Sequence, residues 1–178
     1  MTEEIEFHVK PITPKESGSC SLLVIGIILV LIFLPGNCAV SSERIEGRVI
    51  GVHDGDTLTM LVDGNKKIKI RLAQIDAPES SQAFGQKSKQ ALAKKTFGKD
   101  AVIIQETVDR YGRIVGDVFV SGENINEIQV KQGMAWVYRQ YAHDKSLVYA
   151  EMLARNNRVG LWSESNPVPP WDFRRNRK

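Results

Sequence analysis

Apolar and polar residues alternate along the middle of the chain with the period of two that is typical of β-strands. The alternation is strict in Ile68–Leu72, where three apolar side chains face one way and Lys69 and Arg71 face the other. A turn at Asp63-Gly64-Asn65 precedes this segment and indicates a hairpin. The pattern predicts five strands: Ile45–Val52, Thr57–Val62, Lys66–Gln74, Ala101–Val108 and Ile114–Val120.

Other segments have the composition or the spacing of helices. In Ser146–Asn157, the residues Leu147, Ala150 and Ala154 recur at a spacing that places them on one helical face. The order of strands and helices predicts an α+β fold that is mainly β. A five-stranded OB-type antiparallel barrel with about three packed helices satisfies this order, because closure of the barrel removes exposed sheet edges. The predicted helices are Gln86–Phe97, Asn124–Gln132 and Ser146–Asn157.

The N-terminal part of the chain contains an uninterrupted apolar run, Leu22–Leu34. As a helix this run would be about 20 Å long, shorter than the hydrocarbon core of roughly 30 Å. Its length is typical of a signal peptide, and the small residues Ala39-Val40-Ser41-Ser42 offer a cleavage site. The preceding stretch is long and acidic, so a short uncleaved membrane anchor stays open as the alternative. Either way, we expect an extracytoplasmic protein that is secreted or anchored at the cell envelope.

The remaining composition is that of one globular domain. The chain has 178 residues, of which 42% are hydrophobic and 25% charged, which argues against disorder. Cys20 and Cys38 both flank the apolar run, so no disulfide framework or thiolate metal site supports the rest. The formal net charge is +3, and residues 43–178 alone hold 22 basic and 17 acidic side chains, a net charge of +5 that is a mild bias toward polyanionic partners. We expect a leader at 1–42, the domain at 43–165 and a loose, Pro-rich basic tail at 166–178.

Three short clusters of charged residues lie at the ends of predicted strands: HDGDT at 53–57, RLAQIDAPE at 71–79 and DRYGR at 109–113. Each cluster alone is typical of a turn or a helix cap. Together they supply three carboxylates and two arginines, namely Asp56, Asp76, Glu79, Arg71 and Arg113.

This combination of side chains suits one kind of chemistry. Carboxylates and carbonyls are hard oxygen ligands for Ca²⁺ or Mg²⁺, and the planar fork of arginine matches the oxygens of a phosphate. Hydrolysis of a phosphodiester needs an activated water, a means of spreading charge on the phosphorus oxygens, and a clamp. The clusters therefore predict phosphodiester hydrolysis if the fold brings them together.

The chain from about Arg48 to Trp162 resembles the thermonuclease, or staphylococcal-nuclease-like, family of OB-fold nucleases. The matching stretches are VHDGDTL, IRLAQIDAPE, FGQKSKQAL, DRYGR, INEIQVKQGMAWVY and GLW. The resemblance implies that Ca²⁺ is bound by the side chains of Asp56 and Asp76 and by the backbone carbonyl of Ala77. A well-known member has threonine where this chain has Ala77, a change that leaves the carbonyl in place.

The resemblance also implies roles for the other residues. Glu79 matches the general base, and Arg71 and Arg113 match the arginines that contact the phosphate. The expected activity is calcium-dependent hydrolysis of DNA, and possibly RNA, to products with 3′-phosphate ends. Weaker matches suggest nucleic-acid contacts at Arg110, Tyr111 and Tyr141.

One alternative stays open at this point: a non-catalytic, membrane-tethered OB-fold module that binds nucleic acid. Such modules typically lose one or more of the five charged side chains, and this sequence has them all. The loop between Pro78 and Gly85 is short compared with that of the well-known family member, which leaves the loop on the substrate side of the site open. A monomer without a protein partner is the expectation for a small barrel, with membrane association through Leu22–Leu34.

Overall fold

The computed structural model describes residues 43–177. The predicted leader, with its signal peptide or anchor at Leu22–Leu34, lies outside the described residues, as does Lys178. Among residues 43–177, no helix has both the length and the apolar character that a membrane crossing requires.

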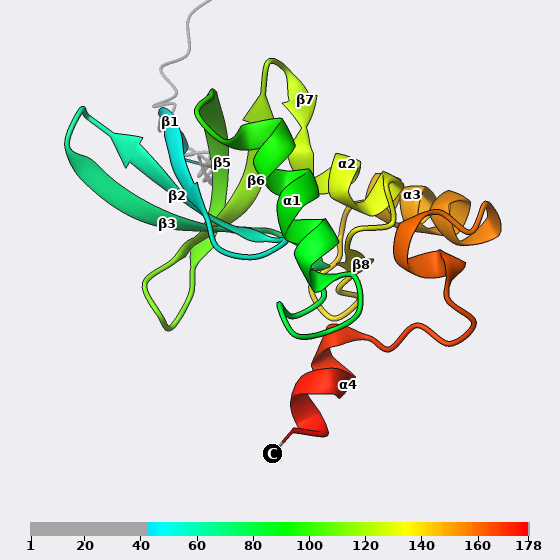
Figure 1. The fold of residues 1–178 in the computed structure, drawn as a ribbon. Coiled ribbons are helices and arrows are strands. Elements are labelled where there is room, and N and C mark those ends of the chain that lie inside the picture. The colour runs from blue at the N-terminus through cyan, green and yellow to red at the C-terminus, as the bar shows by residue number, and fades with distance from the viewer. Residues whose placement is uncertain (1–42, 178) are drawn as a thin grey trace, which may run out of the picture. The chain divides into compact units, whose positions relative to one another are not determined.

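Five strands curve into a closed barrel (Figure 1). Neighbouring strands are antiparallel in the order β3-β2-β1-β5-β6, and β3 then pairs with β6 to close the barrel. The closing pair is parallel, so the predicted OB-type barrel is confirmed except that one of its strand pairs is not antiparallel. The strands are β1 (Arg44–Val52), β2 (Thr57–Val62), β3 (Lys66–Leu72), β5 (Asp100–Val108) and β6 (Ile114–Val120).

The third strand is shorter than the sequence predicts. It ends at Leu72 instead of Gln74, because Gln74 has a φ of 62° and turns the chain out of the barrel. The chain then forms β4 (Ile75–Asp76), which pairs with β8 (Trp136–Val137) in a separate two-stranded sheet. This turn carries Asp76 away from the barrel sheet, although it lies only five residues beyond Arg71 in the chain.

A last short strand, β7 (Glu123–Asn124), extends the barrel sheet beside β6.

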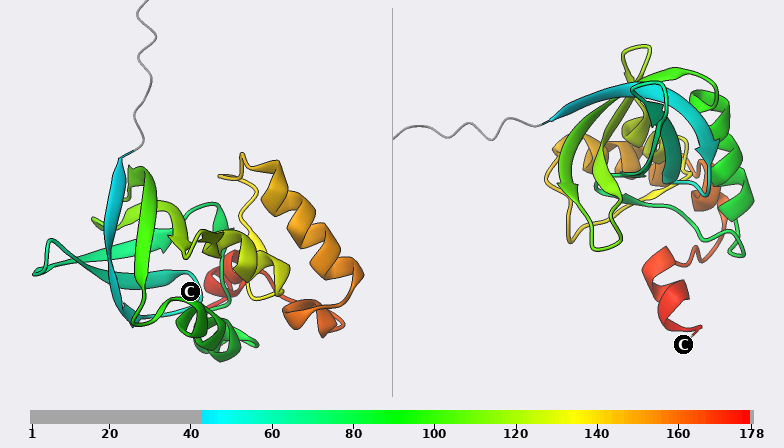
Figure 2. Two further views of the ribbon diagram at one scale, coloured as in Figure 1. Left: turned by 90° about the horizontal axis from the view of Figure 1, so that it is seen from above. Right: turned by 90° about the vertical axis from the view of Figure 1, so that its left-hand side faces the viewer.

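Three helices pack on the barrel, and their ends lie within one residue of the predicted ones. They are α1 (Gly85–Thr96), α2 (Ile125–Lys131) and α3 (Lys145–Asn156). The side chain of Asn124 caps α2 and that of Asp144 caps α3, each by accepting a hydrogen bond from a backbone N–H in the first turn. Figure 2 shows α1 along one side of the barrel, and α2 between the barrel and α3.

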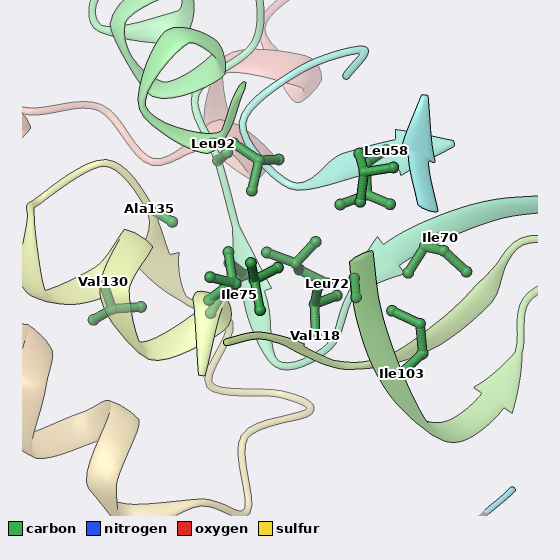
Figure 3. Close-up of a cluster of buried hydrophobic side chains, with 14 of the residues drawn as sticks. Leu58, Ile70, Leu72, Ile75, Leu92, Ile103, Val118, Val130 and Ala135 are labelled. Carbon is green, nitrogen blue, oxygen red and sulfur yellow. The ribbon is translucent and has the colours of Figure 1, made fainter. Parts of the chain in front are cut away.

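The core joins the inside of the barrel to the inner faces of the helices (Figure 3). Ile70 and Leu72 of β3 are buried, as the alternation predicts, while Arg71 points to the other face. Leu92 of α1 and Val130 of α2 complete the cluster. Removal of any such side chain costs about 2–5 kcal/mol, so the core fixes the strands that carry the charged clusters.

The chain beyond residue 163 is not the loose tail that the sequence predicts. After the 3₁₀ helix η1 (Gly160–Ser163), the C-terminal segment (residues 164–177) returns to the loop before α1 and forms α4 (Pro170–Arg175) (Figure 1). Trp171 packs edge-on against Trp136, with ring centroids 5.7 Å apart, and joins a second apolar cluster around Trp162. Burial of these aromatic rings against distant residues orders the segment.

Candidate active site

The turn between β1 and β2 places Asp56 beneath α1. A Cβ atom at Gly55 would lie 1.8 Å from Ser88 Oγ and 2.6 Å from Ala77 Cβ, so only glycine fits there. The side-chain amide of Gln129 also donates a 2.7 Å hydrogen bond to the carbonyl of Gly55. The turn is therefore fixed to both α1 and α2, and Asp56 is buried.

Arg71 joins two of the predicted carboxylates. Its Nη1 forms an ion pair with Oδ1 of Asp56, and its Nη2 lies 3.0 Å from Oδ1 of Asp76. The three residues come from β3, from the turn before β2 and from β4. The fold thus brings the carboxylates of Asp56 and Asp76 together at the guanidinium group of Arg71.

This arrangement sets the charge states of the site. Burial opposes the ionised form of Asp56, but Arg71 and the backbone N–H of Ala77, at 2.8 Å, lower its pKa. Burial likewise acts against the charged form of Arg71, and the negative charges of Asp56 and Asp76 raise its pKa regardless. Asp76 has a raised pKa because burial outweighs its arginine partners. Asp56 and Arg71 are therefore an ionised pair at neutral pH.

Asp54 is a further carboxylate of the site, which the sequence did not single out. Its Oδ1 accepts a hydrogen bond of 3.0 Å from the backbone N–H of Asp56. Burial, together with the charge of Asp56, raises the pKa of Asp54 to about 6. The spacing of two aspartates around Gly55 was the available signal, because a tight turn places both side chains at one strand end.

Glu79 is held by a compact loop between β4 and α1. The backbone N–H of Gln82 donates to the carbonyl of Glu79 at 2.8 Å, and Gln82 Oε1 accepts from the Glu79 N–H at 3.2 Å. A Cβ atom at Gly85 would lie 1.9 Å from that same carbonyl, so the loop closes tightly on the start of α1. The short loop therefore fixes the Glu79 backbone, while the Glu79 side chain is 39% exposed.

Arg174 of α4 connects Glu79 to Asp76. Its Nη2 lies 2.7 Å from Asp76 Oδ2, and its Nη1 lies 2.8 Å from Glu79 Oε1. The hydrogen bonds that Arg174 donates to Asp76 and Glu79 raise its pKa, although burial opposes this. Sequence reasoning missed this residue, since nothing distinguishes Arg174 from its basic neighbours until the segment folds back.

Arg113 does not contact the other four predicted residues. It lies in the turn before β6, where its Nε donates to Asp109 Oδ2 at 2.7 Å. Its Nη groups have no hydrogen-bond partner within residues 43–177. The parallel pairing places Val115 opposite Arg71, so Arg113 lies two residues from that position, at the same end of the closing strand pair.

Tyr111 and Tyr141, at which the sequence predicts weaker nucleic-acid contacts, are exposed aromatic residues. Tyr111 is 69% exposed in the turn of Arg113, and the guanidinium of Arg110 lies 4.9 Å from its ring centroid. Tyr141 is 60% exposed and packs edge-on against Tyr138, with ring centroids 4.9 Å apart. Each ring presents surface to solvent on which a base could stack.

The site offers few protein donors for a metal ion. Within residues 43–177, no three His, Cys, Asp or Glu side chains form a group that could hold a metal. The two carboxylates of Asp56 and Asp76 nevertheless converge on a positive charge, that of Arg71. Hard oxygen donors of this kind fit Ca²⁺ or Mg²⁺ when carbonyl, water or phosphate oxygens supply the remaining ligands.

Comparison with known proteins gives a consistent result. The family model described as staphylococcal nuclease homologue matches residues 69–164. An uncharacterized endonuclease of Haemophilus influenzae is 45% identical over 157 residues, which are 88% of this chain and 86% of the relative. A micrococcal nuclease of Shigella flexneri is 44% identical over 140 residues, which are 72% of this chain and 80% of the relative.

Proposed function

The chain belongs to the staphylococcal nuclease family and is a nuclease that hydrolyses phosphodiester bonds, and from this premise we propose that its reaction depends on calcium. We propose further that it cleaves DNA, and RNA as well, to products with 3′-phosphate ends. The observation that carries the proposal is the single guanidinium of Arg71 between the buried carboxylates of Asp56 and Asp76. Such a pair of acids is costly to bury unless a positive charge balances it.

Asp56 and Asp76 are the side chains that would hold the calcium ion, with the backbone carbonyl of Ala77 beside them. A bound divalent cation supplies positive charge to a phosphodiester oxygen and thereby lowers the cost of charge development on phosphorus. Two carboxylates leave most of the coordination sphere to water and to the substrate. The proposed metal affinity is accordingly modest, and it depends on the substrate.

Side chains of the protein accept the proton and stabilise the developing charge. Glu79 orients a water molecule and accepts its proton as the new oxygen–phosphorus bond forms and the bond to the 5′-oxygen breaks, and the leaving 5′-oxygen takes a proton from solvent water to become a hydroxyl. Arg71 stabilises the charge that develops on the phosphorus oxygens. Arg113 assists with the two Nη groups that Asp109 leaves available, which form a fork suited to phosphate.

The substrate preference follows from what the site can contact. The charged residues engage phosphate, which is common to DNA and RNA and carries no sequence information. Tyr111 and Tyr141 provide exposed rings for stacking, which tolerates any base. The proposal is therefore a nuclease with little base specificity.

Digestion of single-stranded DNA, plasmid DNA and RNA tests this proposal in the presence of Ca²⁺, Mg²⁺ or a chelator. We expect cleavage with Ca²⁺, loss of cleavage with chelator, and product ends that a polymerase extends only after phosphatase treatment. Asp56→Asn should raise the Ca²⁺ concentration needed for half-maximal activity at least about tenfold. The matched control is Asp100→Asn, at an exposed position on β5. Full activity in chelator would contradict the proposal.

We also propose that the protein acts outside the cytoplasm, as the apolar run Leu22–Leu34 suggests. Fractionation of cells that express the full chain tests this. Recovery of the protein only with cytosolic enzymes would contradict it.

A further inference from the structure

The C-terminal segment places a positive charge on the carboxylates that the proposed reaction needs. Arg174 donates from Nη1 to Asp76 Oδ1 at 3.2 Å and from Nη2 to Asp76 Oδ2 at 2.7 Å. Arg71 also contacts Oδ1, so guanidinium groups engage both oxygens of Asp76. The Nη1 of Arg174 is shared with Glu79, at 2.8 Å. One side chain thus engages both a predicted metal ligand and the predicted base.

The same segment covers an aromatic surface beside the site. Trp171 lies three residues before Arg174 and stacks on Tyr138, with ring centroids 5.3 Å apart and planes inclined by 6°. The backbone N–H of Tyr138 donates to the carbonyl of Gln74, which fixes this tyrosine close to β4. A parallel stack on a tyrosine ring is the contact that a nucleobase makes with a single-strand binding protein.

We propose that the C-terminal segment is an autoinhibitory strap, whose Arg174 competes with the divalent cation for Asp76 and whose Trp171 competes with a base for Tyr138. The proposal rests on the proposed function, because both competitors belong to that reaction. In the closed state Glu79 accepts a hydrogen bond from Arg174 and is not free to take a proton from water. Calcium and nucleic acid must displace the strap before cleavage.

The contacts of the strap are of a kind that can open. The Arg174 side chain is 43% exposed, and ion pairs at such positions are weak. The strap is otherwise held by the half-buried ring of Trp171, by the buried Pro170 and by two exposed hydrogen bonds, from Gln82 to the carbonyl of Val168 and from Arg177 to Ser81. A cavity of about 170 Å³ lies between the strap and the loop before α1, lined by Phe173 on one side and by Gln82 and Ala83 on the other.

Calcium binding to the full chain, measured by titration calorimetry without nucleic acid, tests the competition. A strap that is closed in about nine molecules of ten lowers the apparent affinity about tenfold, so Arg174→Ala should bind Ca²⁺ about tenfold more tightly. Trp171→Ala should show the same direction of change while keeping every charge. The matched control is Arg175→Ala, which removes an equal charge from α4 but takes away only the ion pair with Asp172.

Hydrogen exchange of the α4 amides provides a second readout that does not depend on activity. Saturating Ca²⁺ should speed exchange in α4 of the wild-type chain and leave α1 unchanged. Equal affinities in the wild type, Arg174→Ala and Trp171→Ala, or unchanged exchange in α4, would overturn the strap alone. Tighter binding in Arg175→Ala to the same extent as in Arg174→Ala would show a general charge effect and would also overturn it. Absence of Ca²⁺ binding in all four proteins would overturn the calcium site together with the strap.

Discussion

Two carboxylates at the β4–β8 pair, one on β4 and one that reaches β8 from α3, are equally buried and differ in what holds them. Glu151 of α3 is 1% exposed, and its Oε1 accepts a 2.9 Å hydrogen bond from the backbone N–H of Val137 in β8. Its Oε2 contacts Arg139, just beyond β8, and Arg155, one turn later in the same helix. Asp76 of β4 is also 1% exposed. Within residues 43–177, however, every hydrogen bond to the Asp76 carboxylate comes from an arginine side chain.

The difference separates a structural carboxylate from one that can exchange its partners. A backbone N–H cannot leave Glu151 without unpacking β8 from α3, so that interaction belongs to the fold. An arginine side chain can leave Asp76 when another cation arrives, and β4 stays paired with β8 when it does. Burial alone therefore does not mark a functional acid in this protein, whereas the origin of its partners does.

The strongest test of this comparison is Glu79, whose carboxylate is held by Arg174. Glu79→Gln should lower kcat about 10²–10⁴-fold, because the positioned base is lost. Its free energy of unfolding should change by less than about 1 kcal/mol, because the lost ion pair is largely exposed. Steady-state kinetics and urea unfolding measure both, with the surface variant Glu46→Gln as control. A kcat near that of the wild type would remove Glu79 from the mechanism.

Arg113 challenges the comparison, because its Asp109 partner also accepts from backbone N–H groups of its own turn. Judged by the origin of the partners, the Arg113–Asp109 pair is structural, yet the Nη groups of Arg113 are available for phosphate. We expect Arg113→Ala to lower kcat about 10²–10³-fold, the usual cost of losing a group that stabilises the transition state. Arg44→Ala, at an exposed pair on β1, is the control. A loss of stability without a loss of kcat would assign Arg113 to the turn alone.

Paired isosteric variants compare the two buried acids directly. Glu151→Gln should lower the free energy of unfolding by about 2 kcal/mol, because charge-assisted hydrogen bonds are lost, and should leave Ca²⁺ affinity unchanged. Asp76→Asn should change stability by less than about 1 kcal/mol, because burial raises the pKa of Asp76 and so offsets what its ion pairs contribute, and because Arg71 keeps Asp56. It should weaken Ca²⁺ binding at least about tenfold. Chemical unfolding and calorimetry check both. The opposite assignment of the two effects would refute the comparison.

Asp117 of β6 is a third case, a partly buried acid among other acids. Burial raises its pKa to about 6; Glu106 and Asp144 act in the same direction, and His143 opposes them. Its Oδ1 accepts a hydrogen bond from Asn126 at 3.0 Å, which asparagine can also accept. Because the folded state binds the proton more tightly, ionisation of Asp117 costs stability as pH rises from about 4 to 6.

We therefore expect Asp117→Asn to stabilise the protein by about 1 kcal/mol at pH 7, an effect reduced by solvent exposure, and to have almost no effect at pH 3.5. Urea unfolding at the two pH values measures the difference, with the exposed Asp100→Asn as control. A gain that is equal at both pH values would exclude ionisation as its cause.

The sequence predicted most of the barrel because its signals are local. Alternation in Lys66–Leu72 and the caps at Asn124 and Asp144 depend on residues within a few positions of one another, and strands and helices formed where expected. The resemblance to a family named the acids that now lie around Arg71. Neither predicted the parallel closure of β3 on β6, because pairing between distant strands leaves no periodic signal in either one.

The amino-acid sequence by itself determined which elements form, which faces are apolar and which charged residues the chain carries at strand ends. Only the tertiary structure decided which of those charges meet. It turned Asp76 out of the barrel, placed Arg113 apart from the carboxylates, and brought Arg174 back from 98 residues along the chain to Asp76. The physical reason is that hydrophobic patterning depends on residues that are close in the sequence. An ion pair instead forms between residues that packing of the core brings together in space, however far apart they are in the chain.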